Sequence, residues 1–321
     1  MFPPKDSFDS KVARLKDRAH MFKTVRQFFD LRQVTEVDCP IITAKAPIDL
    51  HIDLIEAVLQ NQPTRYLHSS PEFGMKRLIS EGMGDIYQMS HVFRDEEWSC
   101  KHNPEFTMVE WYRLNYSFEQ MIQETIDFIK IFFGEISSQI ISYRELFLKY
   151  TNIDYVTSSE QDLFSFIQKN EIPYYQTILE EGKDALLNLI LGFYIEPKIT
   201  LNELVVLAYY PASQAALAKT TFKENVLVAE RFEIYYQGLE LANGYHELSD
   251  PKEQLCRFQE ANQQRLHFGK KELPIDDNFL EALNKGFPDC SGVAVGFDRL
   301  MMIRQSQNKI ENVLCWDWSK A

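Results

Sequence analysis

The pattern of apolar and polar positions along the chain changes several times between a helical period and a strand period. In residues 8–31, apolar side chains recur every three or four positions, as at Val25 and Phe29, which predicts an amphipathic helix. The following segment, residues 34–42, reads VTEVDCPII and predicts a strand that leads through Pro40. The first predicted elements are therefore a helix and a strand.

Two later segments alternate with the period of two that is typical of β-strands. They are residues 85–96 and residues 104–112, and a polar loop joins them. Because side chains on a strand point alternately to its two faces, we expect Arg94 and Glu96 to share one face of the first strand. One face of the second strand is expected to carry Phe106, Met108, Glu110 and Tyr112.

The middle of the chain has helical periodicity but carries no chemical signature. Residues 117–135 and segments between 158 and 192 show this periodicity. We interpret a range of approximately 117–192 as a helical insertion that packs on the core of a single domain, residues 1–321.

Strand character returns in the stretch RFEIYYQGLELANGYHEL, where Gln237 and Gly238 fit a hairpin turn. Asp250 fits the cap of a following helix, and Ser70 with Pro71 fits the cap and first position of an earlier one. Successive strands in hairpin-like order favour a largely antiparallel sheet with helices, which is an α+β fold.

Composition and charge narrow the functional classes. Of the 321 residues, 45% are hydrophobic and 25% are charged, which is typical of a folded domain. No stretch approaches the roughly 20 apolar residues that span a bilayer, and no signal peptide is recognisable, so we expect a cytoplasmic protein without a membrane partner. The five cysteines form no CxxC pair, which predicts reduced thiols. A net charge of −13 disfavours extensive phosphate contacts with nucleic acid and suits a cationic substrate.

The predicted strand pair of residues 85–112 mixes charged and aromatic groups closely. Arg94 suits a phosphate because its guanidinium donates in a fork. Phe106 suits stacking on a base, and the neighbouring carboxylates suit a metal ion or an ammonium group. Together these groups suit a nucleotide and an amine. The alternative is a solvated hairpin whose charges only keep it soluble.

Three further carboxylates fit the same chemistry. Glu233 and Glu240 lie on opposite sides of the predicted turn, so a hairpin would bring them close, and magnesium bound with substrate phosphates is a common counterion for such a pair. The alternative is two isolated surface acids. Glu247 lies in a mostly apolar segment, and a buried acid needs a partner. That partner is either a substrate ammonium or an internal lysine or arginine.

A glycine-containing junction supplies a candidate anion site. Gly296 closes a short apolar strand, and Arg299 falls in the first turn of the helix that follows. Many strand-to-helix junctions look similar, so this signal is weak alone. Neither the GxxxxGK[ST] nor the GxGxxG pattern occurs, and any nucleotide must be held in another way.

Together these segments resemble the class II aminoacyl-tRNA synthetases, in particular their lysine branch. FRDEEWSCKHNPEFTMVEWY resembles the second signature motif, GVAVGFDRL resembles the third, and the segment ending at Pro40 resembles the first. SPEFGMKRL and LELANGYHEL also agree, so the resemblance runs from about residue 10 to residue 305. It implies the class II catalytic core, an antiparallel sheet flanked by helices, and a homodimer built through the first motif.

The resemblance assigns roles to individual residues. Arg94 and Arg299 would be catalytic, Phe106 would stack beneath the adenine that Glu96 and Asn103 hold, and Gly296 would leave room for the adenosine. The implied ATP-binding residues are Arg94, Asp95, Glu96, His102, Asn103, Phe106, Glu240, Leu241, Gly296 and Arg299. The implied magnesium ligands are Glu233 and Glu240. The implied residues for the amino-acid substrate are Ser70, Pro71, Glu72, Tyr112, Ala242, Asn243 and Glu247.

Three differences from the lysyl-tRNA synthetases narrow the family that this chain resembles. Lysyl-tRNA synthetases carry an N-terminal anticodon-binding barrel, whereas only about ten residues precede the first predicted helix here, so we expect no tRNA partner. Ala242 stands where those synthetases usually have glycine, and His246 replaces a small residue. A methyl group in the amino-acid pocket would reshape it. This combination resembles a paralogous family that activates (R)-β-lysine with ATP and transfers it to elongation factor P.

The resemblance therefore implies a ligase that works through an aminoacyl-adenylate, with ATP and Mg²⁺, and forms an amide on a lysine side chain of elongation factor P. One alternative is the same fold acting on another acceptor. Another is a non-catalytic synthetase-like regulator. Such regulators typically lose the motif arginines or the metal acids, and Arg94, Arg299, Glu233 and Glu240 all remain.

Overall fold

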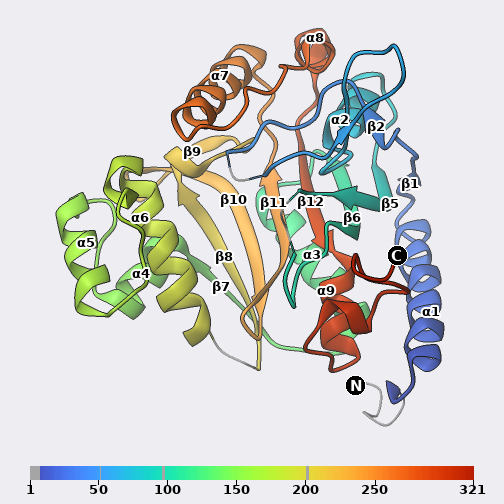
Figure 1. The fold of residues 1–321 in the computed structure, drawn as a ribbon, viewed down its shortest axis with the longest axis horizontal. Helices are drawn as coiled ribbons and strands as arrows, with labels where there is room; N and C mark the ends of the chain where they lie inside the picture. The colour runs from blue at the N-terminus through green and yellow to red at the C-terminus, as the bar shows by residue number, and fades with distance from the viewer. Residues whose placement is uncertain (1–7, 51, 96–97, 200–201) are drawn as a thin grey trace. The chain divides into compact units, whose positions relative to one another are not determined.

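The computed structural model describes residues 8–50, 52–95, 98–199 and 202–321 (Figure 1). Contacts within the chain divide it into two compact units. The first, here called the terminal unit, combines Met1–Glu135 with Glu247–Ala321, and the second, the central unit, is Ile136–His246. The description of the chain as one domain stays a prediction.

The terminal unit is built on a four-stranded section of sheet in the order β1-β5-β6-β12. β5 and β12 both pair antiparallel with β6, whereas β1 pairs parallel with β5. A small antiparallel sheet has the order β2-β4-β3. The strands are β1 (Thr35–Glu36), β2 (Ile42–Thr43), β3 (Glu56–Ala57), β4 (Arg65–Leu67), β5 (Ile86–Phe93), β6 (Glu105–Leu114) and β12 (Cys290–Gly296). The α-helices are α1 (Lys11–Asp30), α2 (Glu72–Ser80), α3 (Phe118–Phe133), α7 (Pro251–His267), α8 (Asp277–Gly286) and α9 (Phe297–Arg304).

Aromatic side chains form much of the core between α1, α3 and this sheet. Phe29 of α1 stacks on Tyr87 of β5, with ring centroids 4.0 Å apart, and meets Trp111 of β6 edge-on. Phe128 of α3 contacts the same Trp111. All four rings are almost fully buried, and such burial is the main favourable contribution to folding.

The central unit has strands in the order β11-β10-β8-β7, with β9 paired to β10. β10 is antiparallel to its neighbours, and β7 pairs parallel with β8. Buried side chains of the helices and strands form one apolar cluster that includes Tyr143, Leu163, Leu187 and Leu207. The strands are β7 (Ser138–Ser142), β8 (Leu204–Pro211), β9 (Thr220–Lys223), β10 (Val226–Tyr236) and β11 (Leu239–His246). The α-helices are α4 (Tyr143–Thr151), α5 (Glu160–Lys169) and α6 (Lys183–Ile190).

The mostly antiparallel α+β architecture confirms the predicted fold class. The predicted hairpin turn is also present, because Gln237 and Gly238 both have positive φ, 52° and 69°, and Tyr236 pairs with Leu239. That geometry belongs to the two-residue turns that match strand twist. The Asp250 side chain caps α7 by accepting from two backbone N–H groups, as predicted.

Other boundaries differ from those predicted. The single strand predicted for residues 34–42 is divided: Thr35–Glu36 form β1, Ile42 begins β2, and the chain between them around Pro40 is irregular, because proline donates no ladder hydrogen bond. Strand β5 ends at Phe93, so Arg94 is not on a strand face as predicted, and its predicted companion Glu96 lies outside the described residues.

Two predicted helices also differ from the prediction, one in where it begins and one in the unit to which it belongs. Helix α2 begins at Glu72 with Pro71 at the cap, one residue later than predicted. Helix α3, predicted as the start of the insertion, belongs to the terminal unit.

No helix among the described residues is both long and apolar enough to cross a bilayer. The five cysteines are all free thiols, as predicted.

Candidate active site

The turn after β5 brings Arg94 close to Phe106. The Arg94 N–H donates to the carbonyl of Pro104 at 2.9 Å, which holds the turn against the start of β6. The guanidinium carbon of Arg94 lies 5.2 Å from the centroid of the Phe106 ring, within the range of a cation–π contact. The next residue, Asp95, donates its N–H to the carbonyl of Asp53 at 2.9 Å. Two residues predicted to bind ATP are thus neighbours in the terminal unit.

Arg299 and His102 are also brought together, although 197 positions separate them in sequence. Arg299 Nη2 lies 2.7 Å from His102 Nε2, and His102 Nδ1 lies 2.8 Å from the Ser99 hydroxyl. Because a guanidinium only donates hydrogen bonds, Nε2 is the acceptor here, which places the imidazole proton on Nδ1. Both residues were predicted to bind ATP.

The backbone next to Arg299 is held by a residue that the sequence did not single out. Asp298 is 1% exposed. Its carboxylate accepts from Arg18 of α1 and from the Thr107 N–H of β6, the latter at 2.6 Å. Arg18 also donates to the Thr107 hydroxyl at 2.8 Å. These bonds fix the first turn of α9 against the sheet, and only the fold brings their partners together.

The side chain of Asn103 is engaged within the protein. Its Nδ2 donates to the carbonyl of Glu105 at 2.7 Å, and its Oδ1 accepts from the Trp318 N–H at 3.0 Å. These two bonds tie the loop before β6 to the C-terminal segment. The predicted contact of Asn103 with adenine therefore stays a prediction, and the amide has one further N–H for it.

Glu72 and Glu247, predicted to bind the amino groups of the substrate, share an internal lysine. Lys76 Nζ lies 2.5 Å from one carboxylate oxygen of each. Lys76 and Glu247 are each 1% exposed. Burial alone would lower the pKa of Lys76, but the charges of Glu247 and Glu72 raise it above its ordinary value. Lys76 is thus the internal cation that the sequence allowed as a partner for Glu247. It contacts one oxygen of each carboxylate.

A third carboxylate, Glu110, lies in the same buried cluster and accepts hydrogen bonds from two hydroxyl groups. Ser70 and Tyr112 each donate to one of its oxygens at 2.6 Å. Burial, followed by the nearby charge of Glu72, raises the pKa of Glu110 from 4.5 to about 8. The sequence placed Glu110 on the correct face, but no role was assigned to it.

Gly292 of β12 closes this cluster from the side of the sheet. A Cβ atom at Gly292 would lie 2.3 Å from a Tyr112 ring carbon and 2.6 Å from Glu247 Oε1. Both distances are far below van der Waals contact, so the position admits only glycine while its neighbours stay in place. At Gly296, by contrast, the atoms nearest to an added Cβ belong to the Arg299 side chain and lie 3.7 Å away or more.

The predicted magnesium ligands lie on the β10–β11 hairpin of the central unit. Glu240 pairs in register with Tyr235, which shares a strand face with Glu233, so the two acids are diagonal neighbours. Glu233 is 6% exposed, and its carboxylate accepts from Arg231 at 2.5 Å and from the Tyr235 hydroxyl. No group of three or more acidic, histidine or cysteine side chains suited to a metal ion occurs among the described residues. The two carboxylates would suit a magnesium ion whose other ligands include the phosphates of a bound nucleotide.

Residues 241–243 of β11 divide between the two faces of the strand. Asn243 is in register with Glu233 and shares its face, and its Oδ1 is buried without a hydrogen-bond partner among the residues that the structure describes. An unsatisfied buried acceptor is costly, so a ligand that donates to Asn243 is favoured. Ala242 is buried and in register with Ile234, on the opposite face. The predicted effect of its methyl group, like the predicted contact of the buried Leu241, stays a prediction.

The sequence matches the family model for class II tRNA synthetases of the D, K and N type over residues 8–318. Together with the mostly antiparallel sheet, this match defines the protein as a class II synthetase-type catalytic domain. The protein is therefore an ATP-dependent ligase.

Similar proteins narrow the class further. The elongation factor P–(R)-β-lysine ligase of Hamiltonella defensa subsp. Acyrthosiphon pisum (strain 5AT) is 38% identical over 315 residues, which cover 97% of this chain and 96% of that protein. The enzymes of the same name from Proteus mirabilis (strain HI4320) and Pasteurella multocida (strain Pm70) are each 38% identical over 317 residues, which cover 97% of each chain. The chain belongs to the elongation factor P–(R)-β-lysine ligase family.

Proposed function

We propose that this enzyme activates (R)-β-lysine with ATP as an acyl-adenylate and transfers it to a lysine ε-amino group of elongation factor P. The observation that carries the substrate assignment is the charge of the cluster of Lys76 with Glu72, Glu110 and Glu247. It holds three carboxylates and one ammonium, so its net charge is −2 when every group is ionised. A substrate with two ammonium groups would neutralise it, and buried charge needs such neutralisation.

The substrate carboxylate would lie toward Arg94. In the first step, a carboxylate oxygen attacks the α-phosphorus of ATP, a bond to that phosphorus forms, and pyrophosphate leaves. Arg94 and Arg299 donate hydrogen bonds to phosphate oxygens as their charge changes, and such preorganised donors lower the barrier most. A magnesium ion held by Glu240 and Glu233 would offset further phosphate charge.

In the second step, the acceptor's ε-amine attacks the carbonyl carbon of the adenylate. A C–N bond forms, the C–O bond to phosphate breaks, and AMP leaves while the nitrogen loses a proton. No nucleophilic side chain of this protein is needed. The surroundings of Gly296 support a nucleotide there, because the atoms nearest to an added Cβ lie 3.7 Å away or more and no neighbour among the described residues requires glycine.

The proposal includes three further expectations that follow from the family resemblance. The enzyme forms a homodimer, it lies in the cytoplasm, and it does not act on tRNA.

The test of the proposed function is mass spectrometry of elongation factor P after incubation with the enzyme, ATP and either (R)-β-lysine or α-lysine. We expect one added β-lysyl group that depends on ATP and is favoured over α-lysyl. An unmodified acceptor, with the label recovered on another protein or a small molecule, would favour the alternative of a different acceptor.

Glu110 makes substrate binding depend on pH. Only the ionised carboxylate attracts an ammonium, so below pH 8 binding must displace a proton from Glu110. We expect the affinity for (R)-β-lysine to rise up to about tenfold per pH unit between pH 6 and 8, with proton release. Glu110→Gln is expected to bind weakly and without this slope. Titration calorimetry in buffers of different ionisation enthalpy measures both quantities.

The matched control is Glu281→Gln. Glu281 is an exposed acid of α8 paired with Lys285, and its replacement is expected to leave the slope intact. Equal pH slopes for wild type and Glu110→Gln would refute the role of Glu110.

A further inference from the structure

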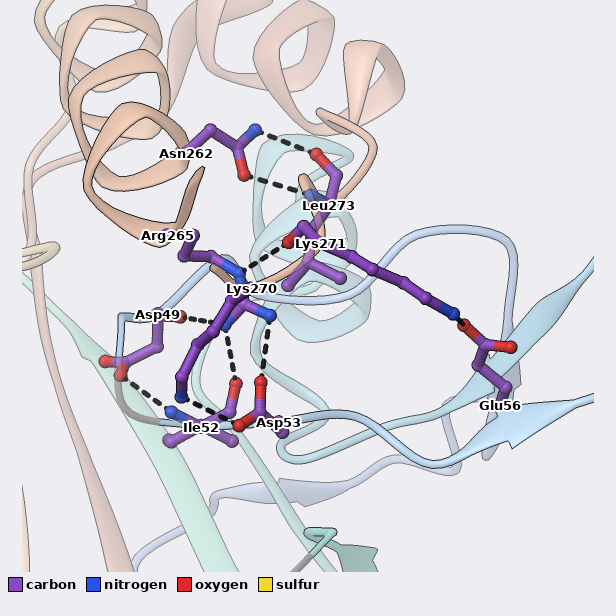
Figure 2. Close-up of polar contacts among 9 residues, drawn as sticks. All are labelled: Asp49, Ile52, Asp53, Glu56, Asn262, Arg265, Lys270, Lys271 and Leu273. Carbon is purple, nitrogen blue, oxygen red and sulfur yellow. Dashed lines mark hydrogen bonds and ion pairs between the residues drawn. The ribbon is translucent and has the colours of Figure 1, made fainter. Parts of the chain in front are cut away.

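Arg265, near the end of α7, is almost fully buried and bonded on several sides. It is 2% exposed. Its guanidinium donates to the carbonyls of Lys271, Asp49 and Ile52 at 3.0, 2.7 and 3.2 Å, and to the Asp53 carboxylate at 2.9 Å. Figure 2 shows these bonds converging on one side chain. A buried guanidinium persists only when its donors are satisfied.

Most of these partners belong to the connection between β2 and β3, more than 200 positions away in sequence. A second cation, Lys270, contacts the other Asp53 oxygen at 2.7 Å. Lys271 and Glu56 extend the attachment with an ion pair of 3.0 Å, as Figure 2 shows. Arg265 and the two lysines that follow α7 therefore hold the β2–β3 connection by binding both its backbone carbonyls and its acidic side chains.

The connection in turn holds the turn that carries Arg94. The carbonyl of Asp53 accepts the Asp95 N–H at 2.9 Å, while the Arg94 N–H donates to Pro104 on the other side. Asp53 thus links Arg265 to the turn that carries Arg94. Its carboxylate accepts from Arg265, and its backbone carbonyl accepts from Asp95, the residue after Arg94.

We propose that Arg265 is a positioning residue for Arg94. By fixing Asp53, it fixes the Asp95 amide and so the direction in which the Arg94 side chain leaves the turn. This inference rests on the proposed role of Arg94 in adenylate formation. An error of about 1 Å in a group that stabilises a transition state costs up to about 100-fold in rate, so a distant clamp of this kind has a measurable effect on turnover.

The experiment compares Arg265→Met with Asn262→Ala in ATP–pyrophosphate exchange with saturating (R)-β-lysine. Asn262 lies on the same helix, is 3% exposed, and its side chain bonds the backbone of Leu273 at 2.9 and 3.0 Å (Figure 2). Both variants are assayed at a temperature where circular dichroism shows them folded. We expect Arg265→Met to lower kcat by about 10- to 100-fold, with a smaller change in the KM for ATP. Asn262→Ala is expected to stay within about twofold of wild type, because its bonds do not reach Asp53.

A second readout follows the amide itself. Hydrogen exchange of peptides that contain Asp95 is expected to be faster in Arg265→Met than in Asn262→Ala. If Arg265→Met does not fold, Asp53→Asn takes its place, with an expected kcat loss of about three- to tenfold. A kcat within twofold of wild type in the folded Arg265 or Asp53 variant, or an equal loss in Asn262→Ala, would overturn the proposal. If Arg94→Ala itself keeps its exchange activity, the proposed function fails instead.

Discussion

Arg94→Ala is expected to lower ATP–pyrophosphate exchange by about 10³-fold or more, the range seen when a transition-state arginine is lost. The loss is large because the guanidinium would contact both the α-phosphate and the attacking carboxylate. Thermal stability is expected to change little, since Arg94 lies beyond the end of β5 and its main-chain bond to Pro104 remains. Exchange of labelled pyrophosphate into ATP, with purified variant and saturating substrate, measures the effect.

The control for this experiment is Lys285→Ala. Lys285 is an exposed cation of α8 whose ion pair with Glu281 has both side chains more than 60% exposed, and such pairs contribute little. The control therefore removes one positive charge and is expected to retain wild-type exchange. Equal activity of wild type and Arg94→Ala would contradict the assignment of Arg94.

Lys76→Met is expected to destabilise the protein by about 3–5 kcal/mol at pH 8, because it leaves buried carboxylates without their internal cation. The methionine fits the space of the lysine stem, so the change is mainly one of charge. The loss is expected to be smaller at pH 5, where Glu110, whose pKa is about 8, is protonated and the cluster carries one negative charge fewer. Urea unfolding followed at both pH values measures the free energy difference.

A double variant separates charge from packing. Lys76→Met combined with Glu72→Gln removes one charge of each sign and restores a net charge of −2 to the ionised cluster. Replacing both members of a buried ion pair is often close to neutral, so the double variant is expected to recover most of the lost stability at pH 8. A double variant as unstable as Lys76→Met alone would show that charge balance is not the cause.

Features encoded by neighbouring residues were predictable from sequence. The hairpin turn at Gln237 and Gly238 was one, and the cap at Asp250 was another, because short-range backbone geometry determines both. The α+β class followed from the same reasoning, since hairpin-like strand succession favours antiparallel pairing. The resemblance to class II synthetases added the family, which the comparisons confirm.

Features that depend on distant residues were not predictable. Lys76 lies four positions from Glu72, but its second partner, Glu247, is reached only through the tertiary fold. The elevated pKa of Glu110 arises from burial, which strand alternation does not reveal. The position of Arg94 outside β5 was missed because the periodic pattern continued past the residue at which pairing ends.

The close approach of Tyr112 and Glu247 to Gly292 limits how the proposed substrate site of this enzyme can be engineered. Randomising Gly292 alone would return mainly inactive proteins, because even a methyl group would overlap the Tyr112 ring. A library intended to accept bulkier acyl groups should first shorten Tyr112 and only then vary the glycine. The order in which the mutations are introduced would therefore decide whether such a selection yields any working ligase.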